Sequence, residues 1–325
     1  MLLSNRLLLA IVVVLGVPAV MVGYIALIEW LMRRLPGRAN RRLRPWLWLA
    51  PGLIILIVYL IYPTVYTILL SFRNADSSQS VGLANYIYVF TNPDMLISLR
   101  NNVLWLVLLT GLVVVFGMLM AVLFDRVSYE SVAKALIFIP MAISFVAAGI
   151  IWKLMFDYQP PGQPQTGLLN GLVTALGGQP VPWLINQGTN NLALIAVGVW
   201  MWTGFSLVIL SAALKSIPEE IIEAARTDGA NEWQILRSIT IPMMSSTIAV
   251  VVTTMVINAL KAFDIVYVMT NGNFNTDVIA NRMYKEMFTF IDFGHASAIA
   301  VVLLIAIVPV MVININRFNQ QEAIR

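Results

Sequence analysis

The sequence has few charged residues for its length. Only 11% of the 325 residues are Asp, Glu, Lys or Arg, whereas 59% are hydrophobic. An ordinary soluble domain is about a quarter charged. A soluble chain this apolar would expose patches that aggregate, so the composition indicates an integral membrane protein. The net charge of +4 is too small to indicate a nucleic-acid-binding face.

Cysteine is absent, and His295 is the only histidine. Disulfides, thiolate metal sites and histidine metal clusters are therefore excluded, and we interpret His295 as structural. The sequence also lacks the phosphate loop G-x-x-x-x-G-K-[ST], the nucleophile elbow G-x-S-x-G and the zinc motif H-E-x-x-H. We expect a chain that forms a path rather than an enzyme, with no catalytic residue, metal or cofactor of its own.

Long hydrophobic runs dominate what is present. An apolar stretch of about 20 residues crosses a bilayer as a helix, whereas barrel strands are short and alternate. The predicted fold is therefore all-α, with about seven transmembrane helices. The predicted spans are 7–32, 47–72, 102–125, 133–156, 191–214, 243–267 and 295–316.

The stretch "RRLPGRANRRLR" sets the predicted orientation. It carries Arg33, Arg34, Arg38, Arg41, Arg42 and Arg44. We interpret it as a cytoplasmic loop because short cytoplasmic loops are rich in Lys and Arg. The N-terminus is then outside and the C-terminus in the cytoplasm. The first span is too long for a signal peptide, and its positive charge follows it rather than precedes it.

The spans divide the chain into three parts. Residues 1–46 form an N-terminal helix with the Arg-rich loop, residues 47–101 form the second span and an outside loop, and residues 102–325 form the core. The outside loops 73–101, 157–190 and 268–294 are rich in Asn, Gly, Pro, Gln and Thr. No sequence repeat marks an inverted-repeat transporter.

A charged segment, 216–242, separates two of the hydrophobic runs. Ser216 and Glu219 have the spacing of a capping box, which predicts a helix over 217–227. Gly229 can take the left-handed conformation that ends a helix, and a second helix is expected from Asn231 until Pro242 breaks it. A solvated loop is the alternative, but it needs no acidic, apolar helix with a Trp. We favour a docking element.

The segment resembles the EAA loop of binding-protein-dependent ABC importer permeases. It reads Glu223-Ala224-Ala225, then Gly229, then Ile239-Thr240-Ile241-Pro242, with Ile241 where the family pattern has Leu. The resemblance implies that the segment docks into a groove on a separate ATPase subunit, which binds ATP and Mg. Glu223 would meet a basic residue there. The implied coupling residues are Glu223, Ala224, Ala225, Gly229, Trp233, Ile239 and Pro242.

Other stretches resemble the carbohydrate branch of this family, of the maltose, glycerol-phosphate and alpha-glucoside type. They are "VGLANY", "ALIFIPMAISFVAAGIIWKLMF", "KAFDIVYVMTNGNFNT", "MYKEMF" and "GHASAIA". Gly272-Asn273-Phe274 departs from the family's Gly-Gly-Pro. The resemblance implies a type I ABC importer permease core with an extra N-terminal helix, in the bacterial inner membrane. It also implies four kinds of partner: a second permease, two ATPase subunits, an extracytoplasmic sugar-binding protein and a small sugar or glycoside.

The spans flanking segment 216–242 hold the candidate substrate path. On one helical face lie Gly198, Met201, Trp202 and Phe205, and the following span carries Met255 and Asn258. Aromatic rings pack against the C–H faces of sugars, and an amide can bind hydroxyls. The alternative for a Trp is anchoring at the lipid interface, which fits Trp200 better.

For the remaining polar residues in the spans we favour structural roles. We favour helix–helix contacts for Ser144, Ser206, Thr253 and Thr254. Lys261 and Asp264 are three residues apart, so we favour a mutual ion pair over substrate contact.

Two other classes of function remain as alternatives. An ion-coupled secondary transporter would need buried carboxylates in mid-span, for which Asp264 is the one candidate. A membrane-embedded enzyme would need clustered acid/base or metal ligands at one depth, and none are visible.

Overall fold

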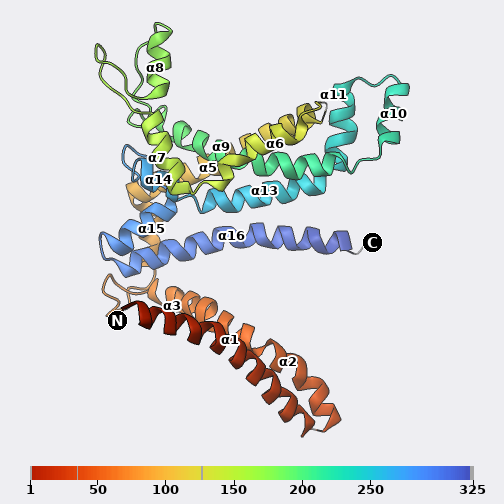
Figure 1. Ribbon diagram of the computed structural model, residues 1–325. Coiled ribbons are helices and arrows are strands. Elements are labelled where there is room, and N and C mark those ends of the chain that lie inside the picture. The colour runs from red at the N-terminus through yellow and green to blue at the C-terminus, as the bar shows by residue number, and fades with distance from the viewer. Residues whose placement is uncertain (1, 35, 126, 323–325) are drawn as a thin grey trace. The chain divides into compact units, whose positions relative to one another are not determined.

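The computed structural model describes residues 2–322 except 35 and 126, and the side chains of 12–312 except 17, 35 and 126 (Figure 1). The described chain is helical, and its only β-type pairing is a single bridge between Arg73 and Ser80. The prediction of an all-α protein is confirmed. Two compact units, Met1–Tyr66 and Thr67–Arg325, are considered separately.

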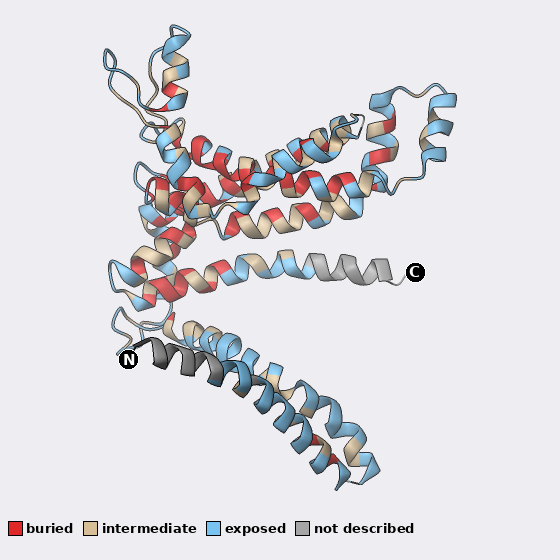
Figure 2. Ribbon diagram, viewed as in Figure 1, coloured by how far each residue is buried: buried red, intermediate tan, exposed pale blue. Residues whose placement is uncertain are grey.

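The first unit consists of α1 (Leu2–Arg33), α2 (Gly37–Leu56), a π-helical turn (Ile57–Ile61) and the start of α3 (Tyr62–Leu70). Asn40 Nδ2 donates to the carbonyl of Met32 (3.0 Å), and Arg44 pairs with Glu29 (2.6 Å). Most of the Arg-rich stretch is therefore the first turns of α2, not the loop that the sequence predicted. Most of the described side chains of this unit are exposed, as lipid-facing helices require (Figure 2).

The second unit begins within α3 and contains the remaining helices. In chain order they are α4 (Ala84–Thr91), α5 (Pro93–Phe124), α6 (Glu130–Phe138), a 3₁₀ turn (Ile139–Ala142), α7 (Phe145–Met155), α8 (Leu168–Ala175), α9 (Asn190–Leu214), α10 (Glu219–Thr227), α11 (Glu232–Ile235), a π turn (Leu236–Thr240), α12 (Ile241–Met243), α13 (Ser245–Leu260), α14 (Asp264–Met269), α15 (Ile279–Phe288) and α16 (Phe293–Glu322).

By length and composition, five described helices can cross a membrane, and two further bent pairs bring the number to as many as seven. The five are Val12–Arg33, Gly37–Leu70, Pro93–Phe124, Asn190–Leu214 and Phe293–Val312. The bent pairs are Glu130–Ala142 with Phe145–Met155 (99°) and Glu232–Met243 with Ser245–Leu260 (72°). The predicted spans are confirmed in number and approximate position.

The span predicted over 133–156 is not one straight helix. Pro140 opens a 3₁₀ turn, and the Ser144 hydroxyl then accepts a hydrogen bond from the Ala147 amide as the N-cap of α7. Ser144 thus starts a helix at the bend instead of joining two helices, so that interpretation was wrong. The span predicted over 243–267 ends early, at Leu260, because α14 begins as a separate short helix at Asp264.

The core of the second unit lies where α5, α9 and α13 pack together. Fully buried members include Trp105, Leu109, Val113, Leu194, Leu207 and Met255. Gly117 of α5 contacts Ser206 of α9 so closely that a Cβ at residue 117 would overlap the serine side chain. The expected helix–helix role of Ser206 is therefore met by packing, since its buried hydroxyl has no hydrogen-bond partner within the described residues.

The hydroxyls of Thr253 and Thr254 bond within their own helix. They donate to the carbonyls of Ala249 (2.8 Å) and Val250 (2.9 Å), one turn earlier in α13, as a threonine in a helix readily does. Neither hydroxyl forms a hydrogen bond to another described helix, and the helix–helix role of this pair stays a prediction.

Candidate functional site: the coupling segment and a membrane cavity

The segment 216–242, which we call the coupling segment after the role that the resemblance implies, forms two short helices, as predicted. The first helix begins two residues later than predicted. Pro218 is the N-cap of α10, and Ser216 Oγ donates to the Ala213 carbonyl at the end of α9 (2.7 Å). The predicted Ser216–Glu219 capping box is therefore wrong. Proline at the N-cap ends the preceding turn and leaves Ser216 bonded to α9 instead.

Gly229 ends α10 in the predicted left-handed conformation, with φ of 84°. The Gly229 amide donates to Arg226 O (3.0 Å), and the Ala230 amide donates to Ala225 O (3.0 Å). This pair of bonds is the Schellman pattern of a helix end. No atom lies within 4 Å of where a Cβ would sit, so a larger residue here would meet backbone strain only.

The second helix begins at Asn231, as predicted, and has a capping box that the sequence analysis missed. Asn231 Oδ1 accepts from the Gln234 amide (2.9 Å), and Gln234 Oε1 accepts from the Asn231 amide (2.8 Å). The helix does not break at Pro242, contrary to the prediction. A π turn over Leu236–Thr240 precedes the proline, α12 continues to Met243, and the bend follows there.

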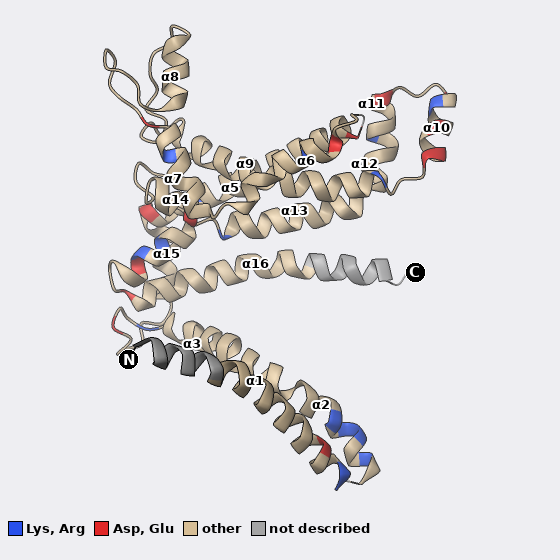
Figure 3. Cartoon of the chain, in the orientation of Figure 1, with Lys and Arg blue, Asp and Glu red and all other residues tan. Residues whose placement is uncertain are grey.

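The two helices turn acidic and aromatic groups toward solvent. Glu223 is exposed, Trp233 is 66% exposed, and Ile235 is buried beneath them. A cavity of about 510 Å³ separates α10 and α11 from the ends of α5 and α9. Figure 3 shows that charged residues gather at this end of the second unit, whereas α9 and α13 are almost free of them. The arrangement offers an outward face that carries exposed acidic and aromatic side chains.

Glu130 connects the root of this segment to α6. Its carboxylate accepts hydrogen bonds from Lys134 in the same helix and from Lys215 at the end of α9 (2.7 Å). The hydrogen bond that Lys215 donates to Glu130 raises the pKa of Lys215. Through Glu130, the bent pair α6–α7 is joined to Lys215, the residue that immediately precedes the coupling segment.

A second cavity, of about 200 Å³, lies in the membrane part of the second unit. From the predicted path it gathers Gly198, Trp202 and Asn258, on α9 and α13. Met201 and Met255 are instead buried in the helix core. Phe205 does not line the cavity, but its ring meets that of Trp202 edge to face at 5.8 Å.

Three aromatic residues of this membrane cavity were missed. Trp105 comes from α5, Phe145 from the start of α7 and Phe263 from the break before α14. Phe145 lies 6.0 Å from Trp202 between ring centroids. Sequence spacing could not reveal them, because the bend at Ser144 and the break after Leu260 bring them to one depth. The cavity thus combines aromatic walls with the amide of Asn258 and the charged side chains of Lys261 and Asp264.

Lys261 and Asp264 both line the membrane cavity without forming an ion pair, so the predicted pairing was wrong. No salt bridge joins them among those of the described residues, because the chain turns between the two helices. Lys261 is the C-cap of α13, and Asp264 is in the first turn of α14. Each charge therefore complements the dipole of its own helix terminus.

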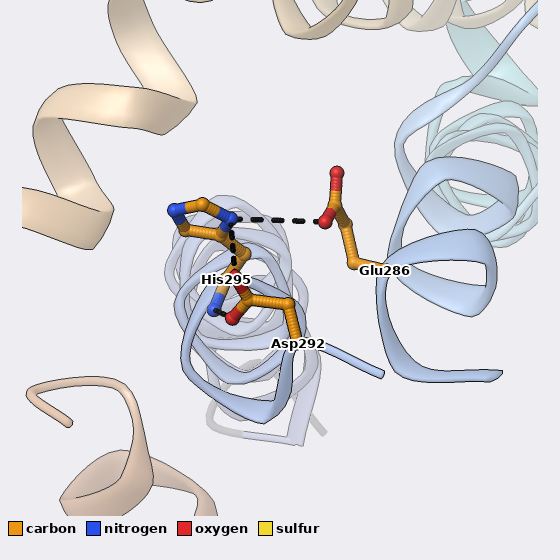
Figure 4. A group of neighbouring side chains, drawn as sticks. All are labelled: Glu286, Asp292 and His295. Atoms are coloured by element: carbon orange, nitrogen blue, oxygen red, sulfur yellow. Dashed lines mark hydrogen bonds and ion pairs between the residues drawn. The ribbon is translucent and has the colours of Figure 1, made fainter. Parts of the chain in front are cut away.

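His295 belongs to a polar network with Glu286 and Asp292 (Figure 4). The network lies at the end of the second unit that is opposite the coupling segment (Figure 1). The Nδ1 atom of His295 lies 2.9 Å from Asp292 Oδ2 and 3.7 Å from Glu286 Oε2, and its ring stacks on Tyr88 at 3.8 Å. Three ligand atoms from Glu286, Asp292 and His295 are close enough to hold a metal ion. The other carboxylate oxygen, Glu286 Oε1, accepts from Tyr88 (2.6 Å) and Arg282 (2.9 Å), so the network also includes α4.

Burial and hydrogen bonding shift the pKa values of this network. Burial and the hydrogen bond to Glu286 raise the pKa of Tyr88 to about 12. Burial alone would raise the pKa of Glu286, but interactions with His295, Tyr88 and Arg282 outweigh it and lower the pKa below its usual value of 4.5. Glu286 therefore stays ionised at neutral pH and holds α4, α15 and α16 together.

Comparison with known proteins identifies the family. Residues 113–321 match the model of the binding-protein-dependent transport system inner membrane component. The chain belongs to this family. The matched region contains segment 216–242 and all of the membrane cavity lining except Trp105 and Leu109. It confirms the resemblance drawn from the EAA pattern. A family that depends on a binding protein gives no support to the ion-coupled alternative.

Two similar proteins are permeases, and one solved structure has a similar fold. The chain is 56% identical to the osmoprotective compounds uptake permease protein GgtC of Synechocystis sp., over 86% of this chain and all of that protein. It is 47% identical to the alpha-glucoside transport system permease protein AglF of Rhizobium meliloti, over 88% of this chain and 85% of that protein. A bacterial ABC transporter that imports alginate has a chain of similar fold, with a TM-score of 0.71, 21% identity, and coverage of 88% and 98%.

Proposed function

We propose that this permease carries a small neutral glucoside into the cell. The observation that carries the proposal is the membrane cavity, which Trp105, Phe145 and Trp202 line together with the Asn258 amide. Flat aromatic rings suit the C–H faces of a pyranose, and an amide suits its hydroxyls. An alpha-glucoside permease and an osmoprotectant permease are both among the similar proteins, and a neutral glucoside satisfies both descriptions.

The Asn258 amide is arranged for such a role. Its Nδ2 donates to the Thr254 carbonyl of its own helix (2.8 Å), which fixes the amide plane. No hydrogen bond from another described residue reaches its Oδ1. A fixed acceptor beside aromatic rings would bind one sugar hydroxyl in a defined direction.

The assembly follows from the family and from the coupling segment. We propose that this chain pairs with a second permease, two ATPase subunits that bind ATP and Mg, and an extracytoplasmic sugar-binding protein. Segment 216–242 would face the cytoplasm, dock into an ATPase groove through Glu223 and Trp233, and transmit closure to α9 and α13. The N-terminus would be outside and the C-terminus inside. The chain itself would hydrolyse no ATP.

Uptake by cells that lack or retain this gene tests the proposal. Cells are supplied with radiolabelled maltose, trehalose or sucrose, all α-glucosides, and with glycine betaine, a non-sugar osmoprotectant. We expect the deletion to abolish uptake of at least one α-glucoside and to leave betaine uptake unchanged. Loss of betaine uptake alone would show that the cavity serves a zwitterion and would overturn the sugar assignment.

A further inference from the structure

A third cavity, of about 400 Å³, lies at the end of the second unit that is opposite the coupling segment (Figure 1). We name it the α14 cavity. Its lining comes from the end of α7, the loop after α8 and the stretch around α14, and includes Phe156, Tyr158, Pro182, Tyr267, Asn273 and Phe274. Its volume lies within the range of about 300–1,000 Å³ that is usual for small-ligand sites.

The lining of the α14 cavity resembles that of the membrane cavity, because each includes aromatic rings, amide side chains, one lysine and one aspartate, here Lys153 and Asp157. Aromatic rings are combined with the side-chain amides of Asn271 and Asn273. Both residues are exposed, and neither amide group forms a hydrogen bond to another described residue. Free amides beside exposed rings are complementary to a polyhydroxylated ligand.

The backbone that presents these groups is strained and firmly held. Asn271, Phe274 and Asn275 have positive φ values of 51°, 57° and 63°, which is unfavourable for a residue as large as Phe. Asn190 of α9 donates to Phe274 O (2.7 Å), and Asn101 of α5 donates to Asn275 O (2.8 Å). This is the turn in which the sequence departs from Gly-Gly-Pro. The departure exposes the Phe274 ring at the cavity.

Stacked rings connect the α14 cavity to the membrane cavity. Phe263 lines the membrane cavity and Tyr267 lines the α14 cavity. The two residues are one helical turn apart, and their rings stack with centroids 5.2 Å apart and planes 22° apart. Tyr284 of α15 contacts both rings, at 5.4 Å and 5.2 Å. A continuous aromatic surface therefore extends from one cavity to the other.

We propose that the α14 cavity is an outer subsite for the transported glucoside. It would take the sugar on release from the binding protein and pass it along Tyr267 and Phe263 to the membrane cavity. This inference rests on the proposed function and on the orientation that places the coupling segment in the cytoplasm. A loop of the binding protein is the competing occupant of the same cavity.

Tyr267→Leu, which removes the ring, and Tyr267→Phe, which keeps it, test the inference. The assay uses the full transporter in proteoliposomes with sugar-loaded binding protein, and measures sugar accumulated per ATP hydrolysed. For Tyr267→Leu we expect this ratio to fall about three- to ten-fold, as loss of one ring contact implies, with unchanged binding-protein docking and ATP hydrolysis. Tyr267→Phe and the control Tyr129→Leu, an exposed residue outside the cavity, should match the parent.

Three outcomes separate the possibilities. An unchanged sugar-to-ATP ratio in Tyr267→Leu would overturn the outer subsite. Loss of binding-protein docking, measured by co-sedimentation, would overturn it too and would assign the cavity to the binding protein. A parent that accumulates no α-glucoside would contradict the proposed function before any variant is compared. Asn273→Ala gives a second, independent reading of the same ratio.

Discussion

Gly117 of α5 and Ser206 of α9 are in close contact, such that a Cβ at residue 117 would lie 2.2 Å from Ser206 Oγ. Gly117→Ala would force a methyl group into the serine side chain, so α5 and α9 would have to separate. Gly111, earlier in the same helix, is a matched control because no atom lies within 4 Å of where a methyl group would sit. We expect Gly117→Ala to lower the melting temperature of the purified transporter by several degrees, as destabilisation of about 1–3 kcal/mol implies.

Gly111→Ala should leave that melting temperature unchanged or raise it slightly, because alanine is the better helix former. Equal effects of the two substitutions, measured by the same thermal unfolding assay in detergent, would show that the α5–α9 contact is not tight.

The lowered pKa of Glu286 predicts that the stability of the folded protein depends on pH. Its pKa in the folded protein lies below the usual 4.5, so the folded state favours the ionised form. The resulting stabilisation is fully present above pH 4.5 and is lost as the pH falls through the lowered pKa. We expect Glu286→Gln to be less stable than the parent at pH 7 and to lose less further stability between pH 5 and pH 3. The prediction would be contradicted if the melting temperatures of Glu286→Gln and the parent fell by the same amount between pH 5 and pH 3.

The sequence was sufficient to predict the helical spans and the two short helices of segment 216–242, because both depend on local patterns. The length of an apolar run indicates the length of a helix. The position of Gly229 indicates where α10 ends, and that of Asn231 indicates where α11 begins. The start of α10 was misplaced because a serine before a proline can bond backward to the previous helix as well as forward. That choice depends on the end of α9, which local spacing does not describe.

The membrane cavity could be predicted only in part. Gly198, Trp202 and Asn258 lie on regular helices, where spacing defines a face. Phe145 and Phe263 follow breaks in helices, and Trp105 comes from a distant span, so their convergence depends on tertiary packing. The ion pair expected for Lys261 and Asp264 failed for a related reason, since the three-residue rule holds only within one uninterrupted helix.

Trp202 and Asn258 provide the prediction for the substrate path. Trp202→Ala or Asn258→Ala should reduce α-glucoside uptake about five- to thirty-fold while the complex still assembles, since a ring contact or a hydroxyl bond contributes about 1–2 kcal/mol. Trp200→Ala is the matched control, because Trp200 packs edge to face on Trp152 (5.5 Å) and lines no part of this cavity. Uptake assays in which all three variants behave alike would return Trp202 to a packing or anchoring role.

The orientation can be tested directly because the chain has no cysteine of its own. Arg38→Cys and Gln79→Cys place single thiols at exposed positions on the two predicted sides. In intact cells an impermeant maleimide should label residue 79 and not residue 38, whereas permeabilised cells should show both. Labelling of residue 38 alone in intact cells would invert the topology.

The central claim is that segment 216–242 couples this permease to an ATPase subunit. Variants of Gly229 and Glu223 test two requirements separately, namely the shape of the segment and its acidic contact. Gly229→Val places a β-branched residue at φ of 84°, which costs on the order of 1–2 kcal/mol and misaligns both short helices. Gly229→Asn is the control, because asparagine tolerates this conformation. Glu223→Ala removes the acidic contact and keeps the helix, since alanine is the best helix former.

The most direct measurement is the amount of ATPase subunit that copurifies with each variant, together with ATP hydrolysis stimulated by sugar-loaded binding protein. Gly229→Val should lose the ATPase subunits, and Gly229→Asn should retain them. Glu223→Ala should retain more ATPase than Gly229→Val but show weakened stimulation. If Gly229→Val and Glu223→Ala both assemble and respond like the parent, segment 216–242 is only a surface loop, and the account of coupling is contradicted.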